Sequence, residues 1–339
     1  MPGPEAAGAD RLSNVLDRIW YGGSPLRWLL APLSALFWLV SSVRRRAYRW
    51  GLLRSVRLPV AVLVVGNLSV GGTGKTPLVI WLASHLQALG HRPGILSRGY
   101  GGTSTAYPRL VAPDSDPAVV GDEPLLLSQR AGCPVAVDPD RARAGQWLLQ
   151  ERGCDVLIAD DGLQHYRLAR DLEIVVIDGQ RRLGNGWVLP AGPLRETPSR
   201  LHSVDLVVVN GEARPGELAM RLAPSDLVAV KDPAVRRPLA TLGGQAVHAI
   251  AGIDNPERFF GLLRGQGAVV EARAFPDHHP FSAQDIEPPG DAPVIMTEKD
   301  AVKCERFAGV RHWMLPVEAV PDPLFVERLD RRLTELLDG

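Results

Sequence analysis

The residues with the most evident chemistry lie in one glycine-rich stretch, Ser69-Val-Gly-Gly-Thr-Gly-Lys-Thr76, here called the phosphate loop. Its glycines let the backbone approach an anion and aim successive N–H groups at phosphate oxygens. Lys75 would neutralise the β- and γ-phosphates of a nucleoside triphosphate, and the Thr76 hydroxyl is placed to ligate Mg²⁺. The residues assigned to nucleotide binding are therefore Ser69, Val70, Gly71, Gly72, Thr73, Gly74, Lys75 and Thr76.

Two positions of the phosphate loop depart from the usual pattern GxxxxGK[ST]. Ser69 stands where the first glycine is usual, and the neighbouring Gly71-Gly72 pair supplies the flexibility. Val70 stands where ATPase switches of the partitioning type, which work by dimerisation, carry a signature lysine. The loop on its own predicts triphosphate binding. It leaves open such a switch and also a soluble small-metabolite kinase or ligase of the dethiobiotin synthetase type.

Two carboxylates, Asp160 and Asp161, follow the apolar run Cys154–Ala159, which reads as a buried strand. The carboxyl end of a strand in a parallel sheet faces the ligand crevice, so a carboxylate there can hold Mg²⁺ directly or through water. Capping of the next turn is the alternative. We assign both aspartates to a metal site with Thr76, and which of the two touches the ion stays open.

Acidic and histidine residues elsewhere suit acid–base chemistry. Asp122 precedes a predicted helix and is either its N-cap or the base that a kinase acting on a hydroxyl requires. The run Asp277-His278-His279-Pro280 has no further His or Cys at ligand spacing, so a histidine that tunes a carboxylate base suits it better than a metal site. The segments Leu189–Glu196 and Thr297–Asp300 are either solvent-exposed turns and caps or parts of the same cleft.

The elements that position these groups alternate along the chain. The phosphate loop lies between a β-branched strand, Pro59–Val65, and a helix, Pro77–Leu89. Further strands are expected at Arg92–Leu96, Pro134–Val137, Cys154–Ala159, Leu172–Ile177 and Val204–Val209, with helices at Glu123–Arg130 and Arg141–Glu151. This alternation predicts a doubly wound parallel sheet of the P-loop NTPase type.

A second α/β series follows a weaker stretch at 226–242. It comprises strands at Val247–Ile253, Val269–Phe275, Pro293–Thr297 and His312–Pro316, a helix at Pro256–Gly265 and a closing helix at Pro323–Leu337. We therefore predict an N-terminal helical segment at 1–58, a phosphate-loop kinase domain at 59–235 and a smaller C-terminal α/β domain at 236–339.

Charge and cysteine content bear on the binding partners of the protein and on the redox state of its cellular compartment. The chain has 38 basic and 38 acidic residues, and this zero net charge argues against a nucleic-acid partner. Three scattered cysteines without CxxC spacing fit a reducing compartment and neither a disulfide framework nor a zinc site.

The N-terminal segment contains sixteen uncharged residues, Trp28–Val43, followed by an arginine cluster. The stretch is shorter than the roughly 20 apolar residues that span a bilayer, and Pro32 interrupts it. We expect an amphipathic helix in the membrane interface, with Trp28, Phe37 and Trp38 in the acyl boundary and the arginines at anionic headgroups. A buried core helix is the alternative.

Taken together, these segments resemble the tetraacyldisaccharide 4'-kinase family, the lipid A 4'-kinases of Gram-negative bacteria. The matching motifs run through nearly the whole chain in the family's order. They are VGNLSVGGTGKTP (Val65–Pro77), SRGYGG (Ser97–Gly102), VGDEP (Val120–Pro124), ADDGLQH (Ala159–His165), LPAGPLRE (Leu189–Glu196), DHHPF (Asp277–Phe281) and TEKDAVK (Thr297–Lys303).

The resemblance implies transfer of the γ-phosphate of ATP, with Mg²⁺, to the 4'-hydroxyl of a tetraacyl glucosamine disaccharide 1-phosphate, which yields lipid IV-A. It implies a monomer bound peripherally to the cytoplasmic face of the inner membrane. Asp122 would be the base, assisted by His278, with His279 as the alternative. Thr76, Asp160, Asp161 and Glu196 would surround Mg-ATP, and His165 and Arg195 would line the nucleotide site.

Overall fold

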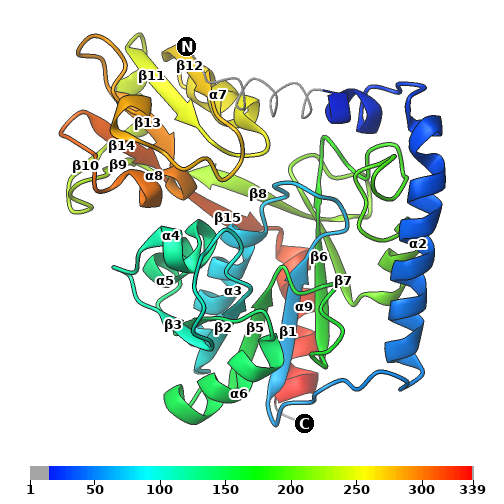
Figure 1. The fold of residues 1–339 in the computed structure, drawn as a ribbon. Helices are drawn as coiled ribbons and strands as arrows, with labels where there is room; N and C mark the ends of the chain where they lie inside the picture. The colour runs from blue at the N-terminus through cyan, green and yellow to red at the C-terminus, as the bar shows by residue number, and fades with distance from the viewer. Residues whose placement is uncertain (1–14, 338–339) are drawn as a thin grey trace.

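The computed structural model of the protein describes residues 15–337, which form a larger and a smaller α/β unit (Figure 1). The larger unit has nine strands: β1 (Ala61–Gly66), β2 (Pro93–Ser97), β3 (Arg109–Val111), β4 (Val135–Val137), β5 (Val156–Asp160), β6 (Leu172–Asp178), β7 (Leu206–Asn210), β8 (Leu218–Pro224) and β15 (Val317–Pro321). They pair in the order β15-β8-β7-β6-β1-β5-β2-β4-β3. Every pair from β8 to β4 is parallel, and only the edge strands β15 and β3 run antiparallel to their neighbours.

Both faces of this sheet are covered, because successive side chains of a strand point to opposite faces. In β1, Leu63 and Val65 pack into one buried apolar cluster, whereas Val62 and Val64 pack into another. The first cluster is completed by α3 (Lys75–Ala88), α5 (Asp122–Arg130) and α9 (Pro323–Leu337), and the second by α6 (Arg141–Arg152) and α2 (Arg27–Arg49). The predicted doubly wound parallel sheet is confirmed.

The smaller unit has six strands: β9 (Leu227–Ala229), β10 (Arg236–Arg237), β11 (Ala246–Ala251), β12 (Val269–Ala274), β13 (Val294–Thr297) and β14 (His312–Leu315). They pair in the order β10-β9-β14-β13-β11-β12. Helix α7 (Pro256–Gly265) covers one face of this sheet with Phe259, Phe260 and Leu263, and α8 (Glu298–Cys304) lies on the other.

The division of the chain differs from the predicted single boundary at 235–236. The small sheet already begins at β9 and ends at β14, after which the chain returns to the large sheet as β15 and α9. In Figure 1, the red β15 and α9 lie with the large unit. The prediction that Pro323–Leu337 closes the small domain is wrong, because Phe325, Leu329 and Leu333 of α9 are buried in the core of the large unit.

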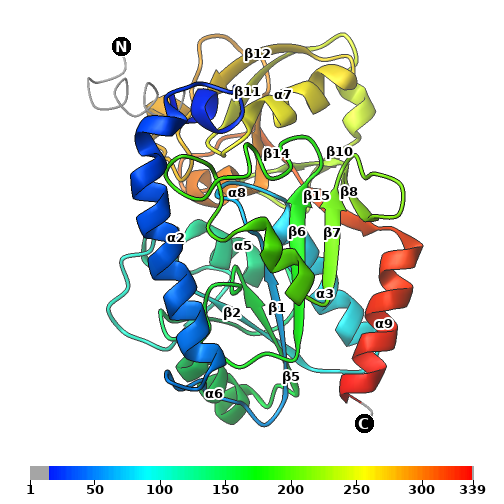
Figure 2. The same cartoon turned by 90° about the vertical axis from the view of Figure 1, so that its right-hand side faces the viewer.

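Helix α2 runs along one side of the large unit, on the side opposite α9 in Figure 2. Only Ser34 of this helix is buried, and its hydroxyl donates to the Val188 carbonyl oxygen and accepts from the Ala191 N–H group, both at 2.9 Å. The alternative of a buried core helix is therefore wrong. Pro32 does not interrupt the helix. Phe37 packs against the large unit's core and so faces the protein, not the predicted acyl boundary.

The opposite face of α2 is apolar and exposed. Its uncovered side chains include Trp28 (60% exposed), Leu29, Leu33, Leu36, Trp38, Leu39, Val40 and Val43. Among the described residues, no helix combines the length and the hydropathy needed to cross a bilayer. Residues 1–14 of the predicted N-terminal segment, and residues 338–339 of the predicted C-terminal domain, lie outside the described part of the chain.

Candidate functional site

The phosphate loop joins β1 to α3, and α3 begins at Lys75. Gly71 and Gly74 adopt φ of 102° and 91°, backbone conformations that L side chains rarely reach. Hydrogen bonds from two neighbouring segments hold the loop in place. Asn210 at the end of β7 donates to the Thr73 carbonyl oxygen at 2.9 Å, and the Val70 N–H group donates to the Pro193 carbonyl oxygen at 2.8 Å. The first turn of α3 thus lies open to an anion at its N-terminus.

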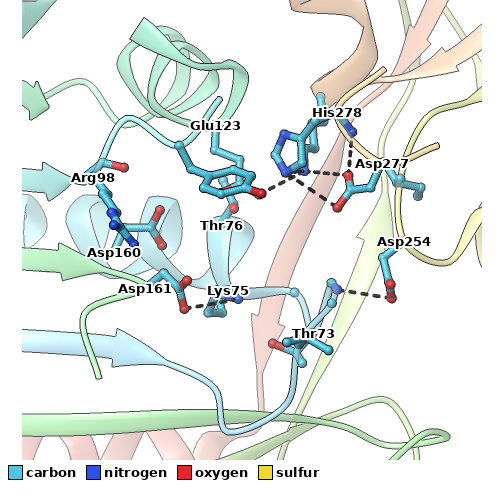
Figure 3. A pocket seen from close by; sticks show the side chains of 18 of the residues that line it. Thr73, Lys75, Thr76, Arg98, Glu123, Asp160, Asp161, Asp254, Asp277 and His278 are labelled. Atoms are coloured by element: carbon cyan, nitrogen blue, oxygen red, sulfur yellow. Dashed lines mark hydrogen bonds and ion pairs between the residues drawn. The ribbon is translucent and has the colours of Figure 1, made fainter. Parts of the chain in front are cut away.

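A cavity of about 1210 Å³ spreads from this loop across both units. The predicted residues that line it are Val70, Gly71, Gly72, Thr73, Gly74, Lys75, Thr76, Asp160, Asp161, His165, Arg195, Glu196 and His278. Ser69 is buried beneath the loop, and Asp122 is buried behind the cavity wall next to His278. Figure 3 places Asp160, Asp161, Lys75 and Thr76 on one side of the cavity and His278 with Asp277 across from them.

The two aspartates at the end of β5 have different surroundings. Asp161, with φ of 45°, accepts two hydrogen bonds from Arg195 at 2.8 and 3.0 Å and lies 3.6 Å from the Lys75 ammonium. Burial opposes ionisation, but Lys75 and Arg195 outweigh it and lower the pKa of Asp161. Asp160 is 2% exposed, and burial together with the nearby Glu123 and Asp161 carboxylates raises its pKa to about 7.

Asp160 has an unsatisfied oxygen. Its buried Oδ1 atom has no hydrogen-bond partner among the described residues. A buried carboxylate oxygen without a donor is costly, and a bound cation is one way to satisfy it. The residues between 15 and 337 contain no group of three His, Cys, Asp or Glu able to hold a metal ion by themselves. The surroundings therefore fit Mg²⁺ bound by few protein ligands, with phosphate oxygens and water supplying the others.

Asp122 and His278 meet across the boundary between the units. The Nδ1 atom of His278 lies 3.0 Å from both carboxylate oxygens of Asp122. Burial opposes charge on both groups, but their hydrogen bond overrides it: the pKa of Asp122 is lowered and that of His278 is raised. His278 has φ of 59° and its ring contacts Tyr100 edge-on, with centroids 5.1 Å apart.

His279 does not reach Asp122. Its ring lies between Phe275 and Phe281, with centroids 4.7 and 4.9 Å away, and its Nε2 atom lies 3.3 Å from Asp285. Of the two adjacent histidines, His278 is the one that contacts the predicted base.

Glu196 and His165 line the same cavity, and they differ in their contacts with neighbouring side chains. Glu196 accepts hydrogen bonds from the Tyr166 hydroxyl and, at 3.2 Å, from Gln164. His165 lies 4.0 Å from Asp140, and burial together with the nearby Arg141 lowers its pKa to about 4. A neutral imidazole at this position can accept or donate a hydrogen bond without adding charge.

Two residues that line the cavity, Asp254 and Lys299, had no role assigned to them from the sequence. Asp254, after β11, accepts a hydrogen bond from the Gly72 N–H group at 3.4 Å and also pairs with Arg181. Lys299 in α8 lies 3.1 Å from Glu123 and 3.0 Å from Asp277. Lys299 belongs to the predicted Thr297–Asp300 segment, of which Thr297, Glu298 and Lys299 line the cavity. The capping alternative also holds, because the Thr297 side chain caps α8. Asp254 carries no comparable local signal.

Comparison with known proteins gives a consistent result. A family model described as tetraacyldisaccharide-1-P 4'-kinase (LpxK) matches residues 26–334. A protein of Alkalilimnicola ehrlichii named tetraacyldisaccharide 4'-kinase is 56% identical over 315 residues, which is 91% of this chain and 92% of that protein. A protein of Nitrosococcus oceani with the same name is 53% identical over 306 residues, 90% of each chain.

A solved structure agrees with these sequence matches. The crystal structure of LpxK from Aquifex aeolicus in complex with ATP is similar with a TM-score of 0.77 and 30% identity, covering 92% of this chain and 99% of that one. The resemblance drawn from the motifs is confirmed. The chain belongs to the tetraacyldisaccharide-1-P 4'-kinase family.

Proposed function

We propose that the protein transfers the γ-phosphate of ATP to the 4'-hydroxyl of a tetraacyldisaccharide 1-phosphate, a step of lipid A biosynthesis. The observation that carries this proposal is one continuous cavity. It joins the phosphate loop and His278 to α2, which contributes Phe37, Val40, Ser41 and Arg44 to the lining. A nucleotide and an acylated sugar can therefore reach the same space from different sides.

The reaction follows from these positions. The acceptor oxygen forms a bond to the γ-phosphorus, the bond between that phosphorus and the β–γ bridging oxygen breaks, and ADP leaves. Asp122, which lies directly behind the cavity-lining His278, accepts the hydroxyl proton, and His278, hydrogen-bonded to the Asp122 carboxylate, orients that carboxylate. Lys75 and the phosphate-loop N–H groups bind the charged phosphates, with Lys75 exchanging its contact to Asp161 for them. The hydrogen bond from Arg195 keeps the Asp161 carboxylate in its position.

A magnesium ion is part of the proposal. Thr76 and Asp160 would hold it, with Asp161 and Glu196 adjacent, and it would neutralise charge on the transferring phosphate. The unsatisfied Oδ1 atom of Asp160 supports this assignment. His165 and the other phosphate-loop residues would complete the nucleotide site.

The proposed location is the cytoplasmic face of the inner membrane, bound peripherally. The support is the exposed apolar face of α2 beside the arginines at its C-terminal end, Arg44, Arg46 and Arg49. Such a helix lies in the headgroup region with its basic end at anionic lipid. We also propose that the enzyme is a monomer.

The decisive assay uses γ-³²P-labelled ATP with tetraacyldisaccharide 1-phosphate in mixed micelles, or with micelles alone. We expect label in the lipid only when the disaccharide is present, with little free phosphate. Lipid-independent release of phosphate would instead indicate an ATPase switch, and label in a water-soluble acceptor only would indicate a metabolite kinase. Either result would overturn the proposal.

The metal assignment predicts a distinct phenotype for Asp160→Asn. The amide keeps the shape but weakens cation binding, so we expect half-maximal turnover to need about tenfold more Mg²⁺. Manganese titration followed by electron paramagnetic resonance, in the presence of a non-hydrolysable ATP analogue, reports binding without turnover. Asp155→Asn, at a surface carboxylate paired with Arg92, is the matched control. An unchanged metal requirement in Asp160→Asn would refute this assignment.

The membrane assignment predicts that charge on the apolar face of α2 releases the protein from lipid. We expect Leu29→Glu together with Leu36→Glu to reduce co-sedimentation with phosphatidylglycerol vesicles about tenfold or more, because both side chains are more than half exposed. Leu89→Glu, at an exposed leucine after α3, should bind as the unaltered protein does. Equal sedimentation of the double variant would contradict interfacial binding by α2.

A further inference from the structure

We infer that Lys303 of α8 is a positioning residue that keeps the Asp122 carboxylate ionised and aimed at His278. The inference rests on the proposed function, since it assigns a role in activating the acceptor hydroxyl. Lys303 lies on the small unit, whereas Asp122 begins α5 of the large unit. The contact therefore ties the proposed base to the helix that faces it.

Lys303 is held between two carboxylates. Its ammonium lies 2.9 Å from Asp300 Oδ1 and 3.7 Å from Asp122 Oδ2, and its side chain is 10% exposed. The other oxygen of Asp300 accepts from the Gly252 N–H group at 2.9 Å and from the Thr297 hydroxyl at 2.7 Å. Asp300 is thus fixed to the small unit, and its Oδ1 atom forms an ion pair with Lys303 that lacks hydrogen-bond geometry.

Lys299, one helical turn earlier in α8, contacts the other member of the pair. Its ammonium lies 3.3 Å from His278 Nε2, and it also pairs with Glu123 and Asp277. The charged and titratable groups that face Asp122 are therefore His278, Lys299 and Lys303, with Glu123 next to it in α5. Lys303 contacts Asp122 itself and not His278, so its effect should be confined to the carboxylate.

The residue types support a specific role. Of the 38 basic residues, only four are lysines: Lys75, Lys231, Lys299 and Lys303. Three of these four lie at the phosphate loop or the Asp122–His278 pair, whereas Lys231 is exposed elsewhere. A lysine ammonium is a compact point charge, while a guanidinium is a broad planar group. The narrow space between Asp122, Asp300 and the Phe281 ring, 4.9 Å from the ammonium, suits the compact group.

The test is the pH dependence of lipid phosphorylation in Lys303→Met. A cation within about 4–6 Å lowers the pKa of a carboxylate, so its removal should move the acidic limb of the kcat/KM profile upward by about one pH unit. Lys303→Arg keeps the charge but not the compact shape, so the limb should move less than in Lys303→Met. Lys231→Met is the matched control and should leave both the limb and the rate unchanged. Affinity for a non-hydrolysable ATP analogue should stay the same in all three.

Two further variants separate positioning from simple packing. Lys303→Met combined with Asp300→Asn avoids leaving an unpaired buried carboxylate and should show the same upward movement, even where Lys303→Met folds poorly by thermal melting. In an Asp122→Asn background, Lys303→Met should cost little more activity, because its effect passes through Asp122.

An acidic limb that stays in place in the well-folded variants, or a full additional loss in the Asp122→Asn background, would overturn the role of Lys303. Phosphorylation by the unaltered protein would still establish the proposed function. Absence of lipid phosphorylation in the unaltered protein would refute the function itself, so the two failures are distinguishable.

Discussion

Asp122→Asn should lower lipid phosphorylation by about 10²–10⁴-fold, since an amide of the same shape cannot accept the acceptor's proton. Asp122 is 4% exposed and its charged contacts are with His278 and Lys303, away from the phosphate loop, so nucleotide affinity should be retained. Steady-state transfer from labelled ATP gives the rate, and equilibrium binding of a fluorescent ATP analogue gives the affinity.

The matched control for this change is Asp116→Asn. Asp116 caps α4 (Pro117–Val120) at an exposed position, and its side chain accepts from the Ala118 N–H group, which an asparagine can also do. Its turnover should equal that of the unaltered protein. Turnover in Asp122→Asn close to that of Asp116→Asn would rule out Asp122 as the base, whatever the role of His278.

Lys75→Met should reduce kcat/KM for ATP by about 10²–10³-fold, the usual cost of removing a preorganised electrostatic contact to a reacting group. The Lys75 side chain is only 12% exposed and lies 3.6 Å from Asp161, and the nearby cation Arg195 is already hydrogen-bonded to that aspartate. Both the affinity for ATP and the rate of transfer should fall, because the same charge binds the ground state and the transition state.

Lys231→Met, at an exposed lysine of the small unit, is the control for Lys75→Met. A nearly unchanged kcat/KM in Lys75→Met would mean that triphosphate is not bound at the phosphate loop. Thermal melting of both variants should show whether the loss is local. Lys75→Met also removes the partner of Asp161, so a modest decrease in melting temperature is compatible with the prediction.

Local patterns predicted the structure around the phosphate loop well. The phosphate loop is one continuous segment between β1 and α3, so its strand, glycines and helix start can all be read from neighbouring positions. The apolar run ending in Asp160 and Asp161 likewise placed these residues at the carboxyl end of β5. In each case, sequence neighbours are also neighbours in space.

The predictions that failed, the domain boundary and the place of the last helix, depend on pairing between segments far apart in the sequence. β15 is a five-residue strand that pairs with β8, from Val317 with Pro224 to Pro321 with Met220, so the paired residues are 93 to 101 positions apart, and neither strand has a long apolar run. Apolar periodicity correctly indicated a helix at Pro323–Leu337, but it carries no information about which sheet that helix covers. The contact of Asp122 with His278 spans 156 positions, and it was expected only through the family resemblance.

The path of the chain between the two units has a consequence for how the protein is made. Strands β1 to β8 leave the ribosome before the small unit, yet β8 pairs with β15, and α3 contacts α9 through Trp81 and Phe325. Domains commonly fold during synthesis in order from the N-terminus. The small unit can therefore complete its sheet first, while the large unit, although most of it is translated earlier, closes its core only when the last residues of the chain have been made.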